Sequence, residues 1–138
     1  MKQRTNLSLS IASLLAGGML YILFRETTYI GEAFSHLHPI VVLRKACYPL
    51  ECNFLKFYFP DFLWGFSLGC GLQAILSPGK HNNLLCGLGV LLCGTVWECM
   101  QAFGIVSGTA DFWDVVSYCL AGALCITLNL KERKYEKD

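Results

Sequence analysis

The stretch 83–103, NLLCGLGVLLCGTVWECMQAF, decides the fold class of this chain. Its only charged residue is Glu98, and as a helix it is long enough to cross the hydrocarbon core of a bilayer. Three further stretches have a similar apolar character, namely 7–24, 60–77 and 111–130. With 54% hydrophobic and 15% charged residues, the chain has more apolar surface than a small soluble domain can bury. We therefore predict one all-α domain over residues 1–138, a transmembrane bundle of four helices.

The connection between the first two crossings, residues 25–58, is not a featureless loop. Ile40–Leu43 is followed by Arg44 and Lys45, and aromatic residues surround Lys56. This makeup is typical of a segment that lies along a membrane surface, so we expect a short interfacial helix there. The connection after the second crossing, Pro78-Gly79-Lys80-His81-Asn82-Asn83, is a turn by composition and sends the third helix back beside its neighbour.

The first apolar segment has a competing interpretation as a cleaved signal peptide. Ala16, Gly17 and Gly18 supply small residues behind a basic start and a short apolar run. The apolar run continues through Phe24, however, which favours a retained crossing. Cleavage after Gly18 would leave three crossings.

The distribution of Lys and Arg predicts the orientation. With four crossings, 7 of the 11 Lys and Arg residues lie on the side of the two chain ends, and 4 lie in the connection 25–58. Because cytoplasmic segments are enriched in positive charge, both ends are expected in the cytoplasm of a multi-pass cell-membrane protein.

Composition excludes some functions and leaves others open. A net charge of +1 gives no basic footprint for nucleic acid. Six of the eight cysteines lie in apolar segments, where we expect small hydrophobes packed between helices, whereas Cys47 and Cys52 would be able to pair if their loop faces an oxidising compartment. His36 and His38 match no compact zinc spacing with these two cysteines, and we expect no metal or cofactor. Gly65-x-x-x-Gly69 has the spacing of close helix packing.

Six polar residues of the crossings fall near the outer helix ends in this topology, and they form our candidate ligand-binding site. They are Asp61, Glu98, Gln101, Asp111, Asp114 and Tyr118. Glu98 shares a helix face with Gln101, and Asp114 with Tyr118, because they are three and four residues apart. An ionised carboxylate in hydrocarbon is costly, so such groups face a bundle interior, a cavity or the interface. Asp111 also fits a helix cap, and Asp114 a first-turn charge.

The segment Trp97–Gly104, WECMQAFG, with Gly108–Val116, GTADFWDVV, and then Ala121-Gly122, resembles the VanZ-like family of small multi-pass bacterial membrane proteins. That family tends to show a Glu-x-x-Gln pair closing one helix and an Asp-Val opening the last, and Glu98, Gln101 and Asp114 fall on those positions. The resemblance covers residues 60–125. The chain departs from the pattern at Ser107-Gly108-Thr109, where an arginine is common, and at Tyr118, where an asparagine is common. The resemblance implies a link to glycopeptide (teicoplanin) resistance or the cell envelope.

These observations lead to one main functional hypothesis and three alternatives. We expect a non-enzymatic protein that binds a lipid headgroup or a glycopeptide-type molecule at the outer face, with membrane lipids as its partners. The first alternative is a membrane enzyme acting on lipid or cell-wall precursors, with Glu98 as general base, although we expect no histidine or lysine to accompany the acids on the same side of the crossings. The others are a transporter or channel subunit, which requires a homo-oligomer to form a pore, and a purely structural partner.

Overall fold

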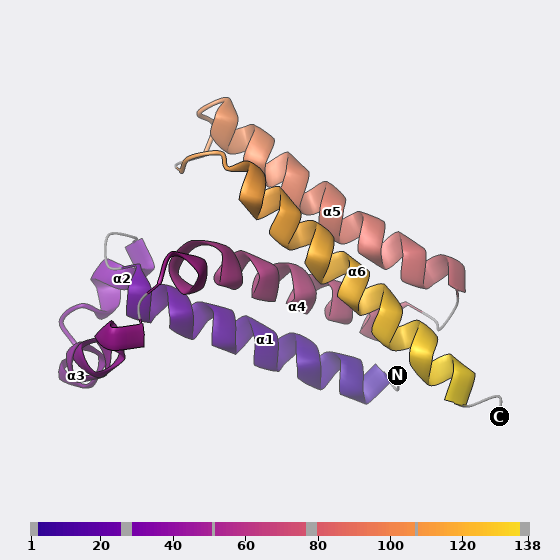
Figure 1. Ribbon diagram of the computed structural model, residues 1–138, viewed down its shortest axis with the longest axis horizontal. Coiled ribbons are helices and arrows are strands. Elements are labelled where there is room, and N and C mark those ends of the chain that lie inside the picture. The colour runs from indigo at the N-terminus through magenta and orange to yellow at the C-terminus, as the bar shows by residue number, and fades with distance from the viewer. Residues whose placement is uncertain (1–2, 26–28, 51, 77–79, 107, 136–138) are drawn as a thin grey trace.

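The computed structural model describes residues 3–25, 29–50, 52–76, 80–106 and 108–135, and all regular structure in this part is helical, as predicted. The four long helices are α1 (Gln3–Phe24), α4 (Phe59–Ile75), α5 (Lys80–Ala102) and α6 (Phe112–Tyr135). They run in alternating directions, so that the start of α1 and the end of α6 lie at the same end of the molecule (Figure 1).

The connection at the opposite end folds into short helical pieces. These are α2 (Tyr29–Phe34), α3 (His38–Cys47), the 3₁₀ turn η1 (Tyr48–Leu50) and the π-helical turn η2 (Phe54–Tyr58), which leads directly into α4. The predicted short helix corresponds to α3, which has Pro39 in its first turn, Arg44 and Lys45 in its last turn, and no buried residue. Two α-helices and two tighter or wider turns therefore replace the single helix that the sequence predicted.

Two predicted helix boundaries are wrong. Lys80–Asn83, expected in a turn, form the first residues of α5, and α6 continues through Lys131–Tyr135, expected in a polar tail. Polar residues lower helix propensity only slightly, so a loss of hydrophobicity does not end the helix. Residues 77–79, which belong to the predicted turn, lie outside the described residues.

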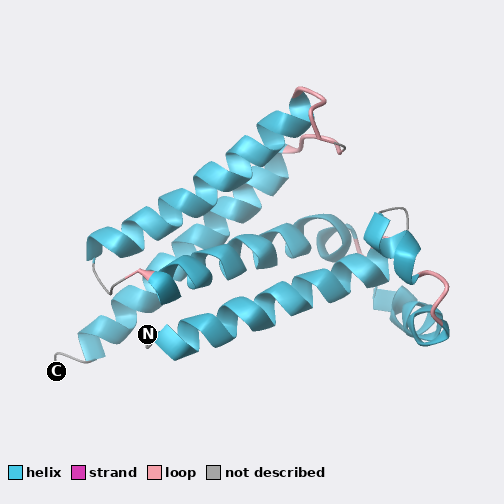
Figure 2. Ribbon diagram, turned by 180° about the vertical axis from the view of Figure 1, so that it is seen from behind, coloured by secondary structure: helices cyan, strands magenta, loops and turns pink. Residues whose placement is uncertain are grey.

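The long helices form two pairs, and α4 connects them. Helix α1 packs along α4, α5 packs along α6, and α4 also contacts both α5 and α6. The core residues Phe66, Cys70, Val90 and Cys125 lie where α4, α5 and α6 meet. Figure 2 shows from behind that the α5/α6 pair diverges from the α1/α4 pair toward the end where α2 and α3 lie.

Polar and small residues join the helices. The Ser10 hydroxyl donates to the Ser67 carbonyl at 2.8 Å, and the Ser67 hydroxyl donates back to the Ser10 carbonyl at 2.7 Å, which connects α1 to α4. The Gln73 amide donates to the Cys125 carbonyl at 3.1 Å and connects α4 to α6. A Cβ atom on Gly69 would lie 2.6 Å from the Cys125 sulfur, so the packing role predicted for the Gly65-x-x-x-Gly69 spacing is confirmed.

The outer surface of the long helices is apolar. Leu15 on α1 and Leu92 on α5 are 64% and 66% exposed, while the polar Gln73 and Glu98 are buried. Two helices, Gln3–Phe24 and His81–Ala102, are long and apolar enough to cross a membrane. Of the four expected crossings, two therefore correspond to helices of sufficient length and hydropathy. Helix α4 has 17 residues, and the apolar part of α6, Phe112–Leu128, is also short.

The cysteines follow the prediction only in part. Cys70, Cys86 and Cys125 are buried among the helices, as expected for small hydrophobes. The prediction is wrong for the other three in the apolar segments, Cys93, Cys99 and Cys119, which lie on exposed helix faces. Cys47 and Cys52 are free thiols in the structure.

Gly17 and Gly18 provide a matched test of the α1/α4 contact. A Cβ on Gly17 would lie 2.5 Å from the Trp64 ring, whereas a Cβ on Gly18 meets nothing within 4 Å. We expect Gly17→Val to lower the free energy of unfolding by about 1–3 kcal/mol, as overpacking does, and Gly18→Val to have little effect. Unfolding of the purified protein in detergent, followed by circular dichroism, measures the difference. Equal stability of the two variants would contradict this packing.

Candidate functional site

A large cavity, which we call the groove, lies between α1, α4 and α5 and ends at the start of α6. Its volume is about 1990 Å³, roughly twice the upper size of a pocket for a drug-sized ligand. Leu14, Leu68, Leu72 and Ile75 line its apolar part, and charged residues line the end near α2 and α3. The groove is therefore amphipathic along its length.

All six residues of the predicted site line this one groove. They come from the first turn of α4, the last turns of α5 and the first turns of α6, because these helix ends meet at the same end of the bundle. Their convergence was expected from the alternating direction of the helices. The six are Asp61, Glu98, Gln101, Asp111, Asp114 and Tyr118.

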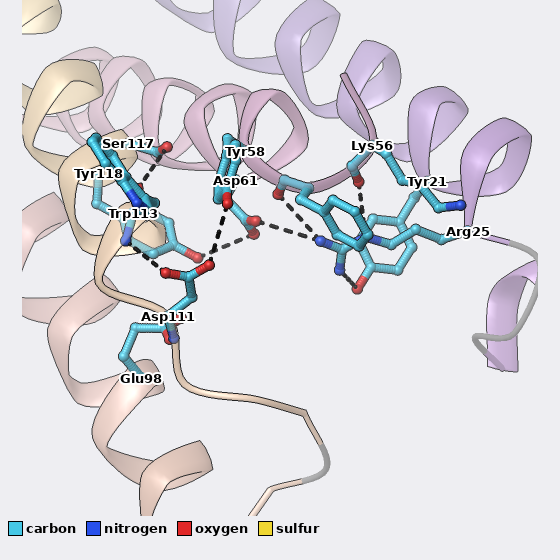
Figure 3. Close-up of polar contacts among 11 residues, drawn as sticks. Tyr21, Arg25, Lys56, Tyr58, Asp61, Glu98, Asp111, Trp113, Ser117 and Tyr118 are labelled. Atoms are coloured by element: carbon cyan, nitrogen blue, oxygen red, sulfur yellow. Dashed lines mark hydrogen bonds and ion pairs between the residues drawn. The ribbon is translucent and has the colours of Figure 1, made fainter. Parts of the chain in front are cut away.

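Asp61 and Tyr118 connect α4 to α6 within the site. The Tyr118 hydroxyl donates to Asp61 Oδ1 at 3.3 Å (Figure 3). The Tyr118 ring lies directly against Gly94 of α5, where any Cβ would collide with it. The absence of a side chain at Gly94 thus allows the tyrosine to reach the carboxylate.

Glu98 and Asp111 hold the connection between α5 and α6. Glu98 is 7% exposed, and its Oε2 accepts the backbone N–H of Asp111 at 2.9 Å. Asp111 Oδ1 accepts the backbone N–H of Trp113 at 3.0 Å, so the interpretation of Asp111 as a helix cap is confirmed. Its other oxygen accepts the Tyr58 hydroxyl at 3.4 Å, and partial desolvation together with this carboxylate raises the pKa of the Tyr58 phenol.

Asp114 and Gln101 complete the acidic side. Asp114 Oδ1 is buried without a hydrogen-bond partner, which is unusual for a carboxylate oxygen. The Gln101 amide lies against Gly108, where a Cβ would collide with it and where φ is +145°, a conformation that favours glycine. The position of Gln101 therefore depends on a glycine in the following loop.

Arg25, which the sequence reasoning left out of the site, brings a cation to these acids. Its guanidinium donates to the Tyr21 hydroxyl at 2.8 Å and to the Lys56 and Phe57 carbonyls at 2.9 and 3.1 Å. Its Nη2 also lies 3.9 Å from Asp61 Oδ2 (Figure 3). The guanidinium therefore joins the end of α1 to η2 and to the first turn of α4.

Three further cations line the same end of the groove, namely Arg44, Lys45 and Lys56. Arg44 donates through Nε and Nη2 to the Ile22 carbonyl at 3.0 and 2.7 Å, which caps the end of α1. The prediction that no lysine accompanies the acids on their side of the crossings is wrong, because Lys45 and Lys56 line the groove with them. A signal was present, because Arg25 follows the first crossing at the end where the acids were predicted.

The arrangement suits the binding of a molecule that is polar at one end and apolar along the rest. The described residues contain no group of three or more His, Cys, Asp or Glu side chains placed to hold a metal ion. The polar end instead offers carboxylates, an amide, the phenols of Tyr21, Tyr48 and Tyr118, and several cations within one groove. Such groups recognise charged and hydrogen-bonding headgroups.

Comparison of the chain with models of protein families, with curated proteins and with solved structures finds no match. The groove and its polar end are therefore interpreted from the residues that form them.

A double-mutant cycle tests the hydrogen bond between Tyr118 and Asp61. Tyr118→Phe keeps the ring against Gly94 and removes the hydroxyl, and Asp61→Asn removes the charge. We expect Tyr118→Phe to cost about 0.5–1.5 kcal/mol alone and clearly less in the Asp61→Asn background, because the lost partner is the same. Denaturant unfolding of the four proteins in detergent gives the coupling energy. Strictly additive effects would mean that the two side chains do not interact.

Proposed function

We propose that this chain is a four-crossing membrane protein of the VanZ-like type that holds one amphiphilic molecule, a membrane lipid or a lipid-linked molecule of the cell envelope, in its groove. The headgroup lies against the polar end at the outer face, and the apolar part extends along α4. Holding such a molecule at the cell surface would affect the cell envelope, as the resemblance implies.

The observation that carries this proposal is the gradient of polarity along the groove. Leu68, Leu72 and Ile75 follow one another down α4 and provide apolar walls, while Asp61 at the start of the same helix faces charged and hydrogen-bonding groups. A small polar ligand needs no apolar channel of this size, and a simple hydrocarbon needs no charged end. An amphiphile matches both parts.

The surface of the long helices supports insertion into a bilayer. Only 17% of the apolar window of α1 and 33% of that of α5 is buried inside the structure, whereas the core helix of a soluble protein is mostly buried. Exposed leucines cover both helices, and hydrogen-bonded serine and glutamine lie between helices. An apolar outer surface with polar groups between the helices is the distribution that a bilayer favours.

Aromatic residues and charges support the proposed orientation. Trp64, Trp97 and Trp113 all lie near the helix ends that carry the site, as do the exposed Phe103 and Phe112. Tryptophan and other aromatic side chains gather at membrane interfaces. With the two chain ends and Lys80 at the other end, the excess of Lys and Arg lies on the cytoplasmic side. Helix α3, with exposed Val42 and Leu43 beside Arg44 and Lys45, suits the outer surface.

Neighbouring positions on α5 allow a matched test of the groove. Cys93 lines the groove, and Leu92 is 66% exposed on another face of the same helix. We expect Cys93→Trp to fill the apolar part and to remove most of the lipid that copurifies with the protein in mild detergent, while Leu92→Trp retains it. Mass spectrometry of extracted lipid measures both. Equal lipid in the two variants, at equal thermal stability, would rule out the groove as the binding site.

Thiol labelling tests the orientation. Cys52 is exposed in the connection before η2, and His81 is exposed in the first turn of α5. We expect a membrane-impermeant maleimide to label Cys52 in intact cells. A His81→Cys variant without Cys47 and Cys52 should react only after the membrane is opened, because residue 81 would lie on the cytoplasmic side, which the reagent cannot reach. The remaining exposed cysteines, Cys93, Cys99 and Cys119, would face lipid, where thiols ionise poorly and react slowly. Labelling of residue 81 in intact cells would invert the proposed topology.

A further inference from the structure

The apolar part of the groove has a floor and two sides, and no element of the described part of the chain covers it. Helix α4 forms the floor with Leu68, Leu72 and Ile75, while Leu14 of α1 and Cys93 of α5 line the two sides. Helices α1 and α5 lie on opposite sides of α4 and do not pack along each other (Figure 1). Helices α2 and α3 lie only at the polar end (Figure 2). We call the opening between α1 and α5 the mouth.

The exposure of the lining residues agrees with an open mouth. Leu14, Leu68 and Ile75 line the groove and are nevertheless exposed, Ile75 to 79%. Cys93, on the α5 side, is exposed as well. Because the side chains that line a closed pocket are buried, this groove encloses its contents only in part. A molecule that lies in it keeps some of its surface outside the protein.

The mouth lies between the two helices that are best suited to a membrane. Helices α1 and α5 contain the segments that are long and apolar enough to cross a bilayer. In the proposed function, the mouth therefore faces hydrocarbon. An apolar tail that is partly exposed there contacts the acyl chains of neighbouring lipids, whereas the same exposure in water would be unfavourable. The surroundings of the mouth thus favour a ligand that stays in the bilayer.

Sideways movement also suits the headgroup of such a ligand. The polar end of the groove lies where α1 ends and α4 begins, at a predicted membrane interface. A lipid that moves sideways from the bilayer keeps its headgroup at that interface. Movement along the groove would instead take the headgroup past Leu68 and Ile75, and a charged group at that depth is costly.

From this geometry we infer that the ligand is a lipid of the surrounding bilayer, which enters and leaves sideways through the mouth. Its headgroup lies at the polar end, and its tail stays in contact with the bilayer. This inference rests on the proposed function and specifies the class of its ligand and the route of entry. A second copy of the chain would cover the mouth with an apolar helix and would bring no headgroup to the polar end.

A removable bridge across the mouth tests the route. Leu14→Cys is introduced and Cys93 is kept, so that each side of the groove has one thiol. The other cysteines outside the core, Cys47, Cys52, Cys99 and Cys119, are replaced by serine. The protein is reconstituted in vesicles of phosphatidylethanolamine and phosphatidylglycerol. Bis-methanethiosulfonate linkers of increasing length then join the two thiols, and a reductant releases them.

The rate of lipid exchange is the measured quantity. The vesicles are fused with vesicles of the same two lipids that carry deuterated chains, and mass spectrometry of the extracted protein follows the replacement of bound lipid. We expect the bridge to slow this exchange by about tenfold or more, because the lipid has to pass a covalent obstacle. Reduction of the linker should restore the original rate.

Leu15→Cys, in place of Leu14→Cys, is the matched control. Leu15 is the next residue on α1 but lies on another, exposed face of the helix. The same linkers react with its thiol and with Cys93, so the groove receives the same chemical group without a bridge. We expect this protein to exchange lipid at the same rate before and after reduction.

Each outcome decides between the alternatives. Slower exchange in the bridged protein alone, or loss of bound lipid in that protein alone, supports entry through the mouth. Equal behaviour of the bridged protein and the control overturns this route and leaves the lipid-binding function standing. Linkers that join two copies of the chain, or that join no thiols at any length, overturn the route too. A parent protein that holds no lipid overturns the proposed function as well.

Discussion

The guanidinium of Arg25 is bound where three segments of the chain meet, and the arrangement of the polar end follows from it. It donates to carbonyls of η2, to Tyr21 one turn earlier on α1, and it approaches Asp61 at the start of α4. An arginine at the apolar end of a helix is expensive unless its donors are satisfied, and the π-helical turn presents two carbonyls that satisfy it. Because these contacts hold α1 and α4 together at this end, the positive charge has a fixed position opposite α5 and α6.

The groove lies between two helix pairs, and close contacts hold the helices together within each pair. Ser10 and Ser67 bring α1 close to α4, and Gly87 with Gly122 brings α5 close to α6, where a Cβ on Gly122 would lie 3.0 Å from the Gly87 carbonyl. Helix α4 belongs to the first pair and contacts both helices of the second, and the pairs diverge toward the end where α2 and α3 lie. The small residues at these contacts let the helices of each pair approach closely. The space between the two pairs, which large apolar side chains would fill, remains as the groove.

The sequence predicts the helices and the convergence of the acidic residues, because both follow from apolar length and alternating direction. Asp61, Glu98 and Asp114 must lie at one end if their helices alternate, and they line one groove. The contribution of Arg25 and the serine contact between α1 and α4 was not predicted. These contacts join residues far apart in the chain, and no local period or propensity records which distant group a polar side chain will meet. The helix boundary at Lys80 was missed because polar composition weakens a helix without ending it.

The four carboxylates of the site differ in the number of partners that the protein itself provides. Asp111 caps α6, and Asp61 has Arg25 and Tyr118 as partners. Glu98 fixes the connection before α6 through one backbone N–H. Asp114 lies in the first turn of α6, where interaction with the positive end of the helix dipole stabilises a carboxylate by about 0.3–1 kcal/mol. Insertion of a charged residue at the centre of a membrane helix costs about 2.5–3.5 kcal/mol, and less near the helix end. In the proposed function, the carboxylate of Asp114 lines the groove and is available to the headgroup of the bound molecule.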